Sequence, residues 1–426
     1  MKLGVSLGAL HDSAERSPAP TCLLNTRMAV RQIILEWISW QSSASYFFWL
    51  YGPAGAGKTS ILQAIAEFLC SPSGSDPNYG GSFFFSREKH GRDQGHFLFS
   101  TIAYQLALKV PGLRQRINRI MELDPTLHTK SMGVQLQKLI VDAFKCLSPL
   151  PQRSYLVIID GLDECHDKRT QQSILQLLCE SIRIHKLPLR FLVGSRPESH
   201  IRDCFDRESL YAITNRVVLD EKFHPGEDIR IFLRHGFAKI CADNSIMSHM
   251  EQWPGEGIID VLVQRSSGQF IYAATVLKFV GVDFCSPRKQ LTLVLRPDPS
   301  ALSDLDQLYT QILSVYPSAV NIVEVLGIIT ASELDSPEVI EDILGMEEGE
   351  LKLVLSGLSS LTDGNGERLH KGVISYVIPP FAHASFRDYL FDSSRSGPFY
   401  VNSQEYKNQV IIRSFALFVR SIRYRR

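Results

Sequence analysis

Two kinds of apolar pattern alternate along the first half of the chain. Short continuous apolar runs predict strands that are buried on both faces, and apolar residues spaced three or four positions apart predict amphipathic helices. The predicted strands are 47–51, 81–85, 155–159, 189–194 and 216–219, and the predicted helices are 28–40, 61–69, 97–110, 134–147 and 170–185. Strands that alternate with helices predict a doubly wound parallel sheet with helices on both faces, which is an α/β fold.

From Pro225 onward the strand patterns mostly disappear. The predicted helices are 227–240, 258–265, 270–280 and 302–315, and the turns between them are expected at PGE, SSGQ and SPRK. The stretch 319–395 then predicts three helices, a turn at TDGNGE, a strand at 373–378 and a short helix at 385–391. Three helices followed by a β-wing indicate a winged helix, and one more helix is expected at 410–419.

A glycine-rich loop joins the strand at 47–51 to the next helix. Its sequence, GPAGAGKT, fits the phosphate-binding pattern G-x-x-x-x-G-K-[ST]. The glycines let backbone N–H groups turn toward phosphates, and the helix N-terminus adds positive potential. Lys58 is expected to reach the β- and γ-phosphates, and Thr59 to offer its hydroxyl to Mg²⁺. The predicted nucleotide-binding residues of this loop are Gly52, Pro53, Ala54, Gly55, Ala56, Gly57, Lys58, Thr59 and Ser60.

A group of acidic residues follows the strand at 155–159. Ligands of doubly wound sheets lie at the carboxyl ends of the strands, so Asp160 is expected to hold Mg²⁺ opposite Thr59. Asp163 and Glu164 lie one turn further, where a carboxylate can orient the attacking water, and the sequence leaves open which of them does so. The alternative is a strand that simply ends in a polar turn.

Arg196 follows the strand at 189–194, within the sequence GSRPE. A guanidinium matches phosphate oxygens in a bidentate manner, so Arg196 is a candidate sensor of the γ-phosphate. The alternative is a surface arginine that caps a turn.

Charge and cysteine usage narrow the class of protein. Lys plus Arg and Asp plus Glu both total 45, so net charge gives no reason to expect nucleic acid or an anionic membrane as partner. The eight cysteines are scattered without a C-x-x-C pair, which favours reduced thiols in the cytoplasm. The N-terminus is a poor signal peptide, and no run of about 18 apolar residues predicts a transmembrane helix.

These motifs, in this order, resemble the NACHT group of signal-transducing P-loop NTPases. The P-loop, YLVIIDGLDE and GSRPE are most similar to fungal members whose P-loop region is called the nephrocystin-like N-terminal domain, and SFFFSR at 82–87 and FAHASFRDYL at 381–390 also resemble that family. The resemblance covers about residues 20–400. It implies an ATPase core, a helical subdomain and a winged helix that close over bound ADP, and that open for oligomerisation when ATP replaces ADP.

The resemblance also carries the winged-helix histidine that contacts the β-phosphate onto His383. By itself this residue also fits a packed core histidine. Two departures stand out. The helical-domain motif that usually carries a proline near the adenine reads SSGQFIYAAT, and the chain shows neither an obvious N-terminal effector domain nor C-terminal repeats.

A chain of 426 residues is expected to form two to four domains. The expected order is a leader or linker at 1–27, an α/β P-loop NTPase domain at 28–223, an all-α helical domain at 224–318, a winged-helix-like domain at 319–400, and a C-terminal helix with a basic, solvated tail at 401–426. The function expected of this architecture is an ATP/ADP-dependent molecular switch that hydrolyses ATP slowly with Mg²⁺ and forms a homo-oligomer in its ATP state.

Two other functions fit parts of the sequence. One is a nucleotide-binding scaffold that does not hydrolyse, which the motifs alone do not exclude. The other is a winged-helix DNA-binding ATPase. Its recognition helix would be 346–358, MEEGELKLVLSGL, which carries three glutamates against Lys352. Because phosphates repel an acidic helix, nucleic acid is not expected as a partner.

Overall fold

The computed structural model describes residues 4–40, 45–72, 74, 76, 78–244, 247, 253–282, 285–296, 303–315, 322–331, 336–362, 367–370, 373–376, 378–379 and 381–424. It divides into two compact units, Met1–Asp228 and Ile229–Arg426. The division lies close to the boundary predicted between residues 223 and 224. The further divisions predicted at 318 and 400 fall inside the second unit and stay predictions.

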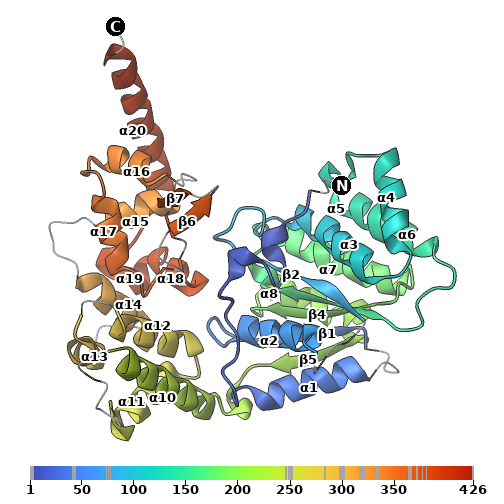
Figure 1. The fold of residues 1–426 in the computed structure, drawn as a ribbon, viewed down its shortest axis with the longest axis horizontal. Coiled ribbons are helices and arrows are strands. Elements are labelled where there is room, and N and C mark those ends of the chain that lie inside the picture. Colours follow the sequence, from blue (N-terminus) through green and yellow to red (C-terminus); the bar gives the residue numbers. More distant parts are fainter. Residues whose placement is uncertain are drawn as a thin grey trace. The chain divides into compact units, whose positions relative to one another are not determined.

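A five-stranded sheet forms the centre of the first unit (Figure 1). All neighbouring strands pair in parallel, in the order β2–β3–β4–β1–β5. Because β4 lies between β1 and β3, the carboxyl ends of these three strands are adjacent. The strands are β1 (Phe47–Tyr51), β2 (Tyr79–Phe84), β3 (Tyr155–Asp160), β4 (Leu189–Ser195) and β5 (Thr214–Val218).

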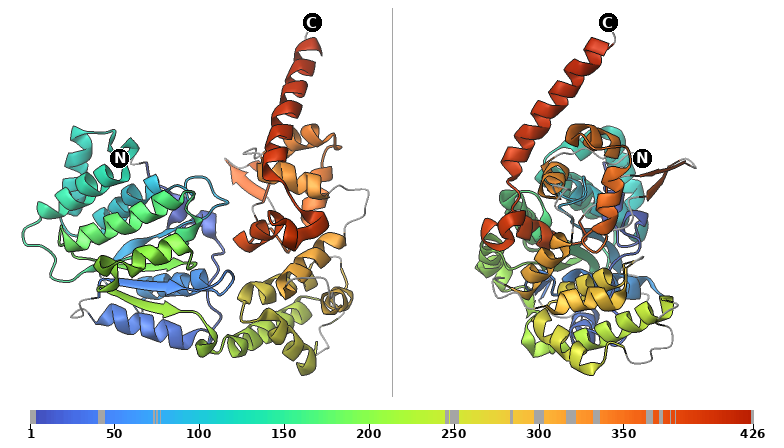
Figure 2. Two further views of the ribbon diagram at one scale, coloured as in Figure 1. Left: turned by 180° about the vertical axis from the view of Figure 1, so that it is seen from behind. Right: turned by 90° about the vertical axis from the view of Figure 1, so that its left-hand side faces the viewer.

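Helices cover both faces of this sheet. In β1, Phe47 and Trp49 point into one core, and Phe48 and Leu50 point into the other. This double burial explains the continuous apolar runs in the sequence and confirms the predicted doubly wound α/β fold. Figures 1 and 2 show the two layers. One face carries α1 (Met28–Ser39) and α2 (Lys58–Cys70), and the other carries α3 (Leu98–Lys109), α4 (Leu113–Leu123), α5 (Met132–Gln135), a π-helical segment (Leu136–Val141), α6 (Asp142–Lys145), α7 (Lys168–Arg183), α8 (Ser199–Asp206) and α9 (Glu208–Tyr211).

Helix α4 has no counterpart among the predicted elements. It buries Leu113, Ile117 and Met121 along a single stripe, and most of its other residues are polar. Together with Ile120, these residues recur at helical spacing, so the sequence carries a helical pattern that the prediction does not include. In the structure α4 packs on its neighbours α3 and α6.

Residues 4–27 differ from the leader or linker predicted from the sequence, because they belong to the first unit and pack on its strand β2 and helix α2. The His11 N–H donates to Ser82 Oγ (3.0 Å) on the edge strand β2. Arg16 is 8% exposed; it donates to Gln63 Oε1 of α2 (2.7 Å), and its guanidinium lies 3.6 Å from the centre of the Phe84 ring. These polar and cation–π contacts leave no periodic apolar pattern, so the sequence does not reveal them.

The second unit is mostly helical, shown in green-yellow to red in Figure 2. Its described elements are α10 (Pro225–Asp243, which begins in the first unit), α11 (Glu256–Ser266), α12 (Phe270–Val280), α13 (Pro287–Leu295), α14 (Asp304–Ser314), α15 (Ile322–Ala331), α16 (Pro337–Leu344), α17 (Glu350–Gly357), β6 (Glu367–His370), β7 (Val373–Tyr376), α18 (Ala384–Leu390), α19 (Ser393–Ser396) and α20 (Ser403–Tyr424). Helices α15 to α17 followed by the antiparallel pair β6–β7 repeat the predicted order of a winged helix, and that assignment stays a prediction.

Two predictions for the second unit are wrong. The SPRK segment, predicted as a turn, starts α13: Pro287 occupies the first turn, where a helix needs no N–H from it. Helix α20 is also longer than the predicted 410–419. The predicted turn at TDGNGE lies mostly outside the described residues. Among the helices that the structure describes, none is both long and apolar enough to span a bilayer.

Candidate phosphate- and metal-binding site

The loop between β1 and α2 has the backbone that a phosphate-binding turn requires. Gly55 (φ +72°) and Gly57 (φ +89°) adopt left-handed conformations that side chains disfavour. Gly52 lies so close to Leu219, the residue after β5, that a Cβ on it would be 3.1 Å from the Cβ of Leu219. Lys58 is the first residue of α2, so the loop ends at a helix N-terminus with its partial positive charge.

Lys58 lies across this loop. Its Nζ donates to the carbonyl oxygens of Gly52 and Pro53, both at 2.9 Å. Removal from water lowers the pKa of the ammonium, and the carboxylates of Asp163 and Asp160 act in the opposite direction. The cation is therefore held between the glycine-rich loop and the acids that follow β3.

Asp160 closes strand β3 and is only 2% exposed. Burial raises the pKa of its carboxyl group, whereas a hydrogen bond from Thr59 and the nearby cations Arg16 and Lys58 lower it. Among the described side chains, Oδ1 of Asp160 is one of the few buried polar atoms without a hydrogen-bond partner. A Cβ on Gly194 of β4 would lie 2.6 Å from that oxygen and 2.5 Å from Leu62 Cδ1, so only glycine leaves room for the Asp160 carboxylate beside β4.

The chemistry of these groups fits a magnesium ion. Mg²⁺ prefers oxygen donors and keeps several of its own waters, so one carboxylate and one hydroxyl suffice on the protein side. Asp160 and Thr59 supply these two oxygens and already contact each other.

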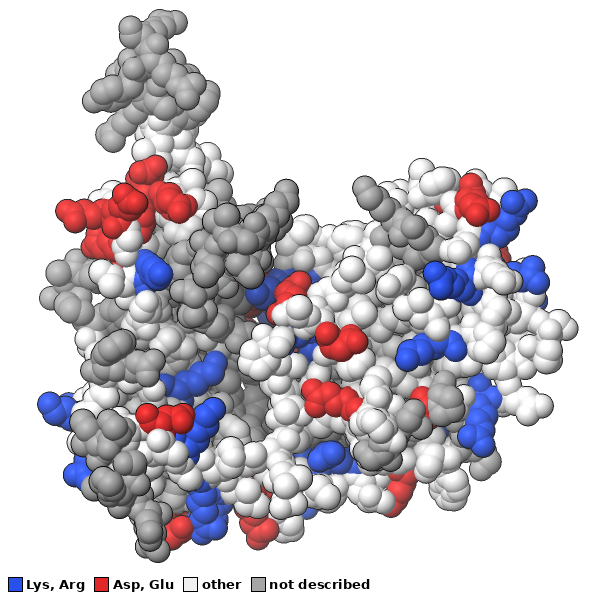
Figure 3. All heavy atoms as spheres, in the orientation of Figure 1, with Lys and Arg blue, Asp and Glu red and all other residues white. Residues whose placement is uncertain are grey.

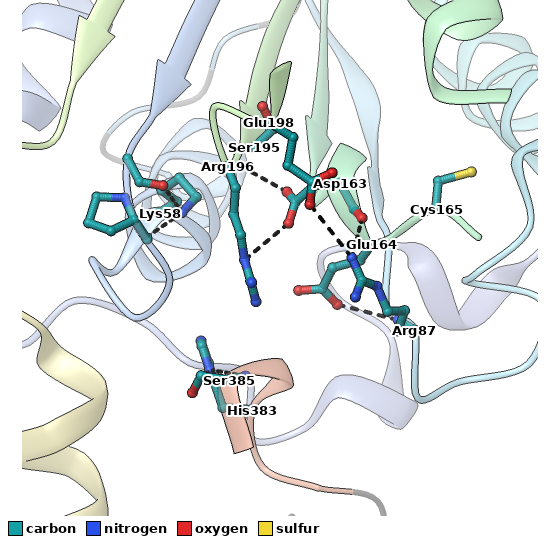
Figure 4. Close-up of polar contacts among 12 residues, drawn as sticks. Lys58, Arg87, Asp163, Glu164, Cys165, Ser195, Arg196, Glu198, His383 and Ser385 are labelled. Atoms are coloured by element: carbon teal, nitrogen blue, oxygen red, sulfur yellow. Dashed lines mark hydrogen bonds and ion pairs between the residues drawn. The ribbon is translucent and has the colours of Figure 1, made fainter. Parts of the chain in front are cut away.

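Asp163 and Arg196 form an ion pair beside this site (Figure 4). The Arg196 N–H donates to Asp163 Oδ1 (2.9 Å), and Arg196 Nε lies 3.3 Å from Oδ2. The Asp163 side chain is only 3% exposed. Both oxygens of this carboxylate are therefore occupied by one arginine, which joins the end of β4 to the loop after β3.

Glu164 is in a different environment. The N–H of Arg87, in the loop after β2, donates to its Oε2 at 3.3 Å. Removal from water raises the pKa of Glu164 to about 7, and the negative charges of Asp163 and Asp160 add to the increase. A carboxylate with a pKa near neutrality is suited to general-base chemistry.

Three residues that the sequence did not single out support the loop after β3. Arg87 Nη2 donates to the Asp163 carbonyl (2.7 Å), and Gln171 Nε2 of α7 donates to the Cys165 carbonyl (2.6 Å). Gly194 provides the space beside Asp160 described above. The segments SFFFSR and GSRPE contain Arg87 and Gly194, but nothing local marks Gln171, because its role depends on where α7 packs.

His383 belongs to the second unit, so its predicted contact with a nucleotide stays a prediction. It is the N-cap of α18. Its Nδ1 accepts a hydrogen bond from the backbone N–H of Ser385 (3.1 Å) and also lies 2.7 Å from Ser385 Oγ. With Nδ1 as an acceptor, the neutral ring carries its proton on Nε2.

Part of the first unit is similar to a known protein family. The model of the family described as nephrocystin 3, N-terminal, matches residues 30–196. This range contains the P-loop, the acids after β3 and, as its last residue, Arg196.

Two further comparisons add little. One similar solved structure is the ORC2 protein of Aeropyrum pernix in ADPNP–ADP complexes. It covers 94% of this chain and 96% of its own, with 12% identity and a TM-score of 0.36, values too low to bear on function. No curated protein matches the chain.

Proposed function

We propose that this chain is an ATP/ADP-binding molecular switch of the NACHT type that hydrolyses ATP slowly with Mg²⁺. The proposal rests chiefly on one arrangement: Lys58 on its glycine-rich turn, next to a buried carboxylate, Asp160, whose Oδ1 has no hydrogen-bond partner. A buried polar atom without a partner is costly, and a bound ligand at this site would supply the missing partner of Asp160 Oδ1. The match of residues 30–196 to the nephrocystin 3 N-terminal family agrees with a P-loop NTPase.

In this function the residues from Gly52 to Ser60 bind the phosphates, with Lys58 as the main cation. Asp160 and Thr59 hold Mg²⁺, which neutralises charge on the phosphates when bound. Arg196 senses the γ-phosphate. Because Arg196 also forms an ion pair with Asp163, a movement of Arg196 changes the position of the loop after β3.

Glu164 is the better candidate to orient water. Both oxygens of Asp163 already interact with Arg196, whereas Glu164 has a pKa of about 7 and accepts a hydrogen bond from the Arg87 N–H at Oε2. A base that titrates near neutrality can accept a proton from water and return it. In this division of roles, Asp163 positions the loop and Glu164 acts on the water.

The switching part of the proposal concerns the second unit. Its element order α15 to β7 supports a winged helix, and His383 has an Nε2–H to donate to the β-phosphate of ADP. Exchange of ADP for ATP then releases this contact, and the opened chain assembles into a homo-oligomer. Such a role in intracellular signalling fits a cytoplasmic protein, and all eight cysteines are free thiols.

A non-hydrolysing scaffold remains the alternative outcome of the kinetic tests below. The DNA-binding alternative has little support. Glu338, Asp342, Glu347 and Glu348 are exposed on and beside α16, and Figure 3 shows acidic side chains gathered over this part of the second unit. Such a surface repels the phosphates of DNA.

The direct test is calorimetry of ADP and MgATP binding to the wild-type chain and to Lys58→Ala. We expect the variant to bind at least about tenfold more weakly, because a phosphate loses its nearest cation. Lys109→Ala, at the exposed last residue of α3, is the matched control and is expected to bind as the wild type does. Equal binding by wild type and Lys58→Ala, or no binding by the wild type, contradicts the proposal.

A further inference from the structure

A buried arginine outside the known motifs contacts the P-loop. Arg27 is the N-cap of α1 and is 4% exposed. Its Nη2 donates to the carbonyl oxygen of Ala56 at 2.8 Å, from 29 positions away in the sequence. Arg27 itself has φ +56°, a left-handed backbone that is uncommon outside glycine. The local strain indicates that surrounding contacts hold this residue in place.

The contact with Ala56 determines how the P-loop backbone is oriented. The C=O and N–H of a trans peptide point in opposite directions. Arg27 holds the Ala56 carbonyl on its own side, so the N–H of Gly57 in the same peptide points away from Arg27. Inward-pointing N–H groups are what a phosphate-binding loop uses, so the arginine orients one such donor in advance.

Asp228 holds Arg27 from the other side. The Arg27 N–H donates to Asp228 Oδ2 (3.1 Å), and Arg27 Nε lies 4.0 Å from the same oxygen. The two side chains are 3% and 17% exposed, so water screens the pair only weakly. Asp228 lies in the first turn of α10, the helix that begins in the first unit and continues into the second.

We propose that Arg27 is a positioning residue of the phosphate site and that Asp228 couples it to the first turn of α10. Nucleotide affinity then depends on whether the first turn of α10 keeps Asp228 in contact with Arg27. A bound nucleotide in turn stabilises this contact, because coupling between two sites is reciprocal. Both residues lie outside the range 30–196 that the family model matches. The inference rests on the proposed nucleotide-binding function.

The decisive experiment compares two buried arginines. Arg190 of β4 resembles Arg27: it is 5% exposed and donates to the backbone carbonyls of Ile38 (3.2 Å) and Ser45 (3.3 Å), but it does not contact the P-loop. ADP affinity is measured by calorimetry, and stability by thermal unfolding, for Arg27→Met and Arg190→Met.

Both variants are expected to melt at lower temperature. Only Arg27→Met should bind ADP about tenfold more weakly at a temperature where both are folded, because only it loses a donor that orders the loop. A lower melting temperature with wild-type ADP affinity in Arg27→Met overturns the inference and makes Arg27 a purely structural residue.

Two milder variants keep the test valid if Arg27→Met does not fold. Arg27→Lys retains the charge and the backbone N–H donated to Asp228, but a single ammonium replaces the separate Nη2 and Nε groups that lie at Ala56 and Asp228. Asp228→Asn retains an acceptor for the backbone N–H of Arg27 without the ion pair. We expect about threefold weaker ADP binding for each, and unchanged binding in both contradicts the coupling. If the wild type itself binds no ADP or ATP, the proposed function fails. If it binds and the variants match it, only this inference fails.

Discussion

The backbone N–H of Arg196 donates to Oδ1 of Asp163 at 2.9 Å, and the side-chain Nε of the same arginine lies 3.3 Å from Oδ2. One arginine thus uses both oxygens of a nearly buried carboxylate, from backbone and side chain together. The loop after β3 and the end of β4 are therefore joined at the site where the phosphate-binding loop also ends. The pair gives Asp163 surroundings different from those of its neighbour Glu164, which accepts a hydrogen bond from the Arg87 N–H.

Replacing Asp163 by Asn is expected to destabilise the first unit by about 1–3 kcal/mol, because the amide offers Arg196 only one acceptor oxygen in a buried place. Urea unfolding of Asp163→Asn measures this loss. The matched control is Asp206→Asn. Asp206 is half-exposed and pairs with Arg216 at the surface. The control is expected to change stability by less than about 1 kcal/mol. Equal effects of the two substitutions refute a structural role for the Asp163–Arg196 pair.

Replacing Glu164 by Gln is expected to slow ATP hydrolysis at least about a hundredfold while ADP binding stays close to wild type, because only the reacting water loses its base. Single-turnover kinetics with MgATP measures the chemical step. Asp163→Asn serves as the internal comparison and should slow hydrolysis less. Hydrolysis at the wild-type rate in Glu164→Gln assigns the water to another residue or favours the non-hydrolysing scaffold.

The pKa of Glu164, raised to about 7, predicts two pH dependences. The ionised carboxylate is the base, so kcat/KM should rise with pH through an acid limb near 7. Stability changes in the opposite sense. Between pH 4.5 and 7 the folded state binds more protons at this site than the unfolded state, so its contribution to the free energy of unfolding falls as the pH rises. Glu164→Gln should therefore melt higher than wild type at pH 8 and close to it at pH 5; an identical difference at both pH values contradicts the raised pKa.

Replacing Asp160 by Asn is expected to raise the melting temperature and to weaken the Mg²⁺ dependence of nucleotide binding. Burial outweighs the attraction of Arg16 and Lys58 for this carboxylate, since its pKa is raised, so a neutral amide is easier to bury. ADP titrations with and without Mg²⁺ are compared with thermal unfolding. A lower melting temperature together with an unchanged Mg²⁺ dependence identifies Asp160 as a structural carboxylate and not a metal ligand.

The predicted contact of His383 with ADP needs a variant that spares the helix it caps. Asn is a good N-cap and keeps an acceptor for the Ser385 N–H, whereas Leu also removes the cap at a cost of about 1 kcal/mol. If the Nε2–H contacts ADP, His383→Asn and His383→Leu should both release ADP about tenfold faster in stopped-flow measurements. Only His383→Leu should lower the melting temperature. Wild-type release by the Asn variant rules out the contact.

The sequence by itself determined the features that neighbouring residues create. A phosphate turn between a strand and a helix, and an acid at the end of a strand, are made of consecutive positions, so GPAGAGKT and Asp160 were recognisable at once. The apolar runs also predicted the doubly wound sheet, because burial on both faces removes polar alternation from a strand. The prediction omits helix α4 although its apolar residues have helical spacing. It also places a turn at SPRK, because a proline such as Pro287 is compatible both with a turn and with the first turn of a helix.

Only the tertiary structure decided which side chains meet. Asp163 and Arg196 are 33 positions apart, and Arg27 and Asp228 are 201 apart. No local pattern pairs them, because the strand order brings the ends of β3 and β4 together and the packing of α1 and α10 brings Arg27 to Asp228. The surroundings of Asp163 and Glu164 differ for the same reason: the two acids are adjacent in the sequence, but Asp163 contacts Arg196 after β4, whereas Glu164 accepts a hydrogen bond from Arg87 after β2.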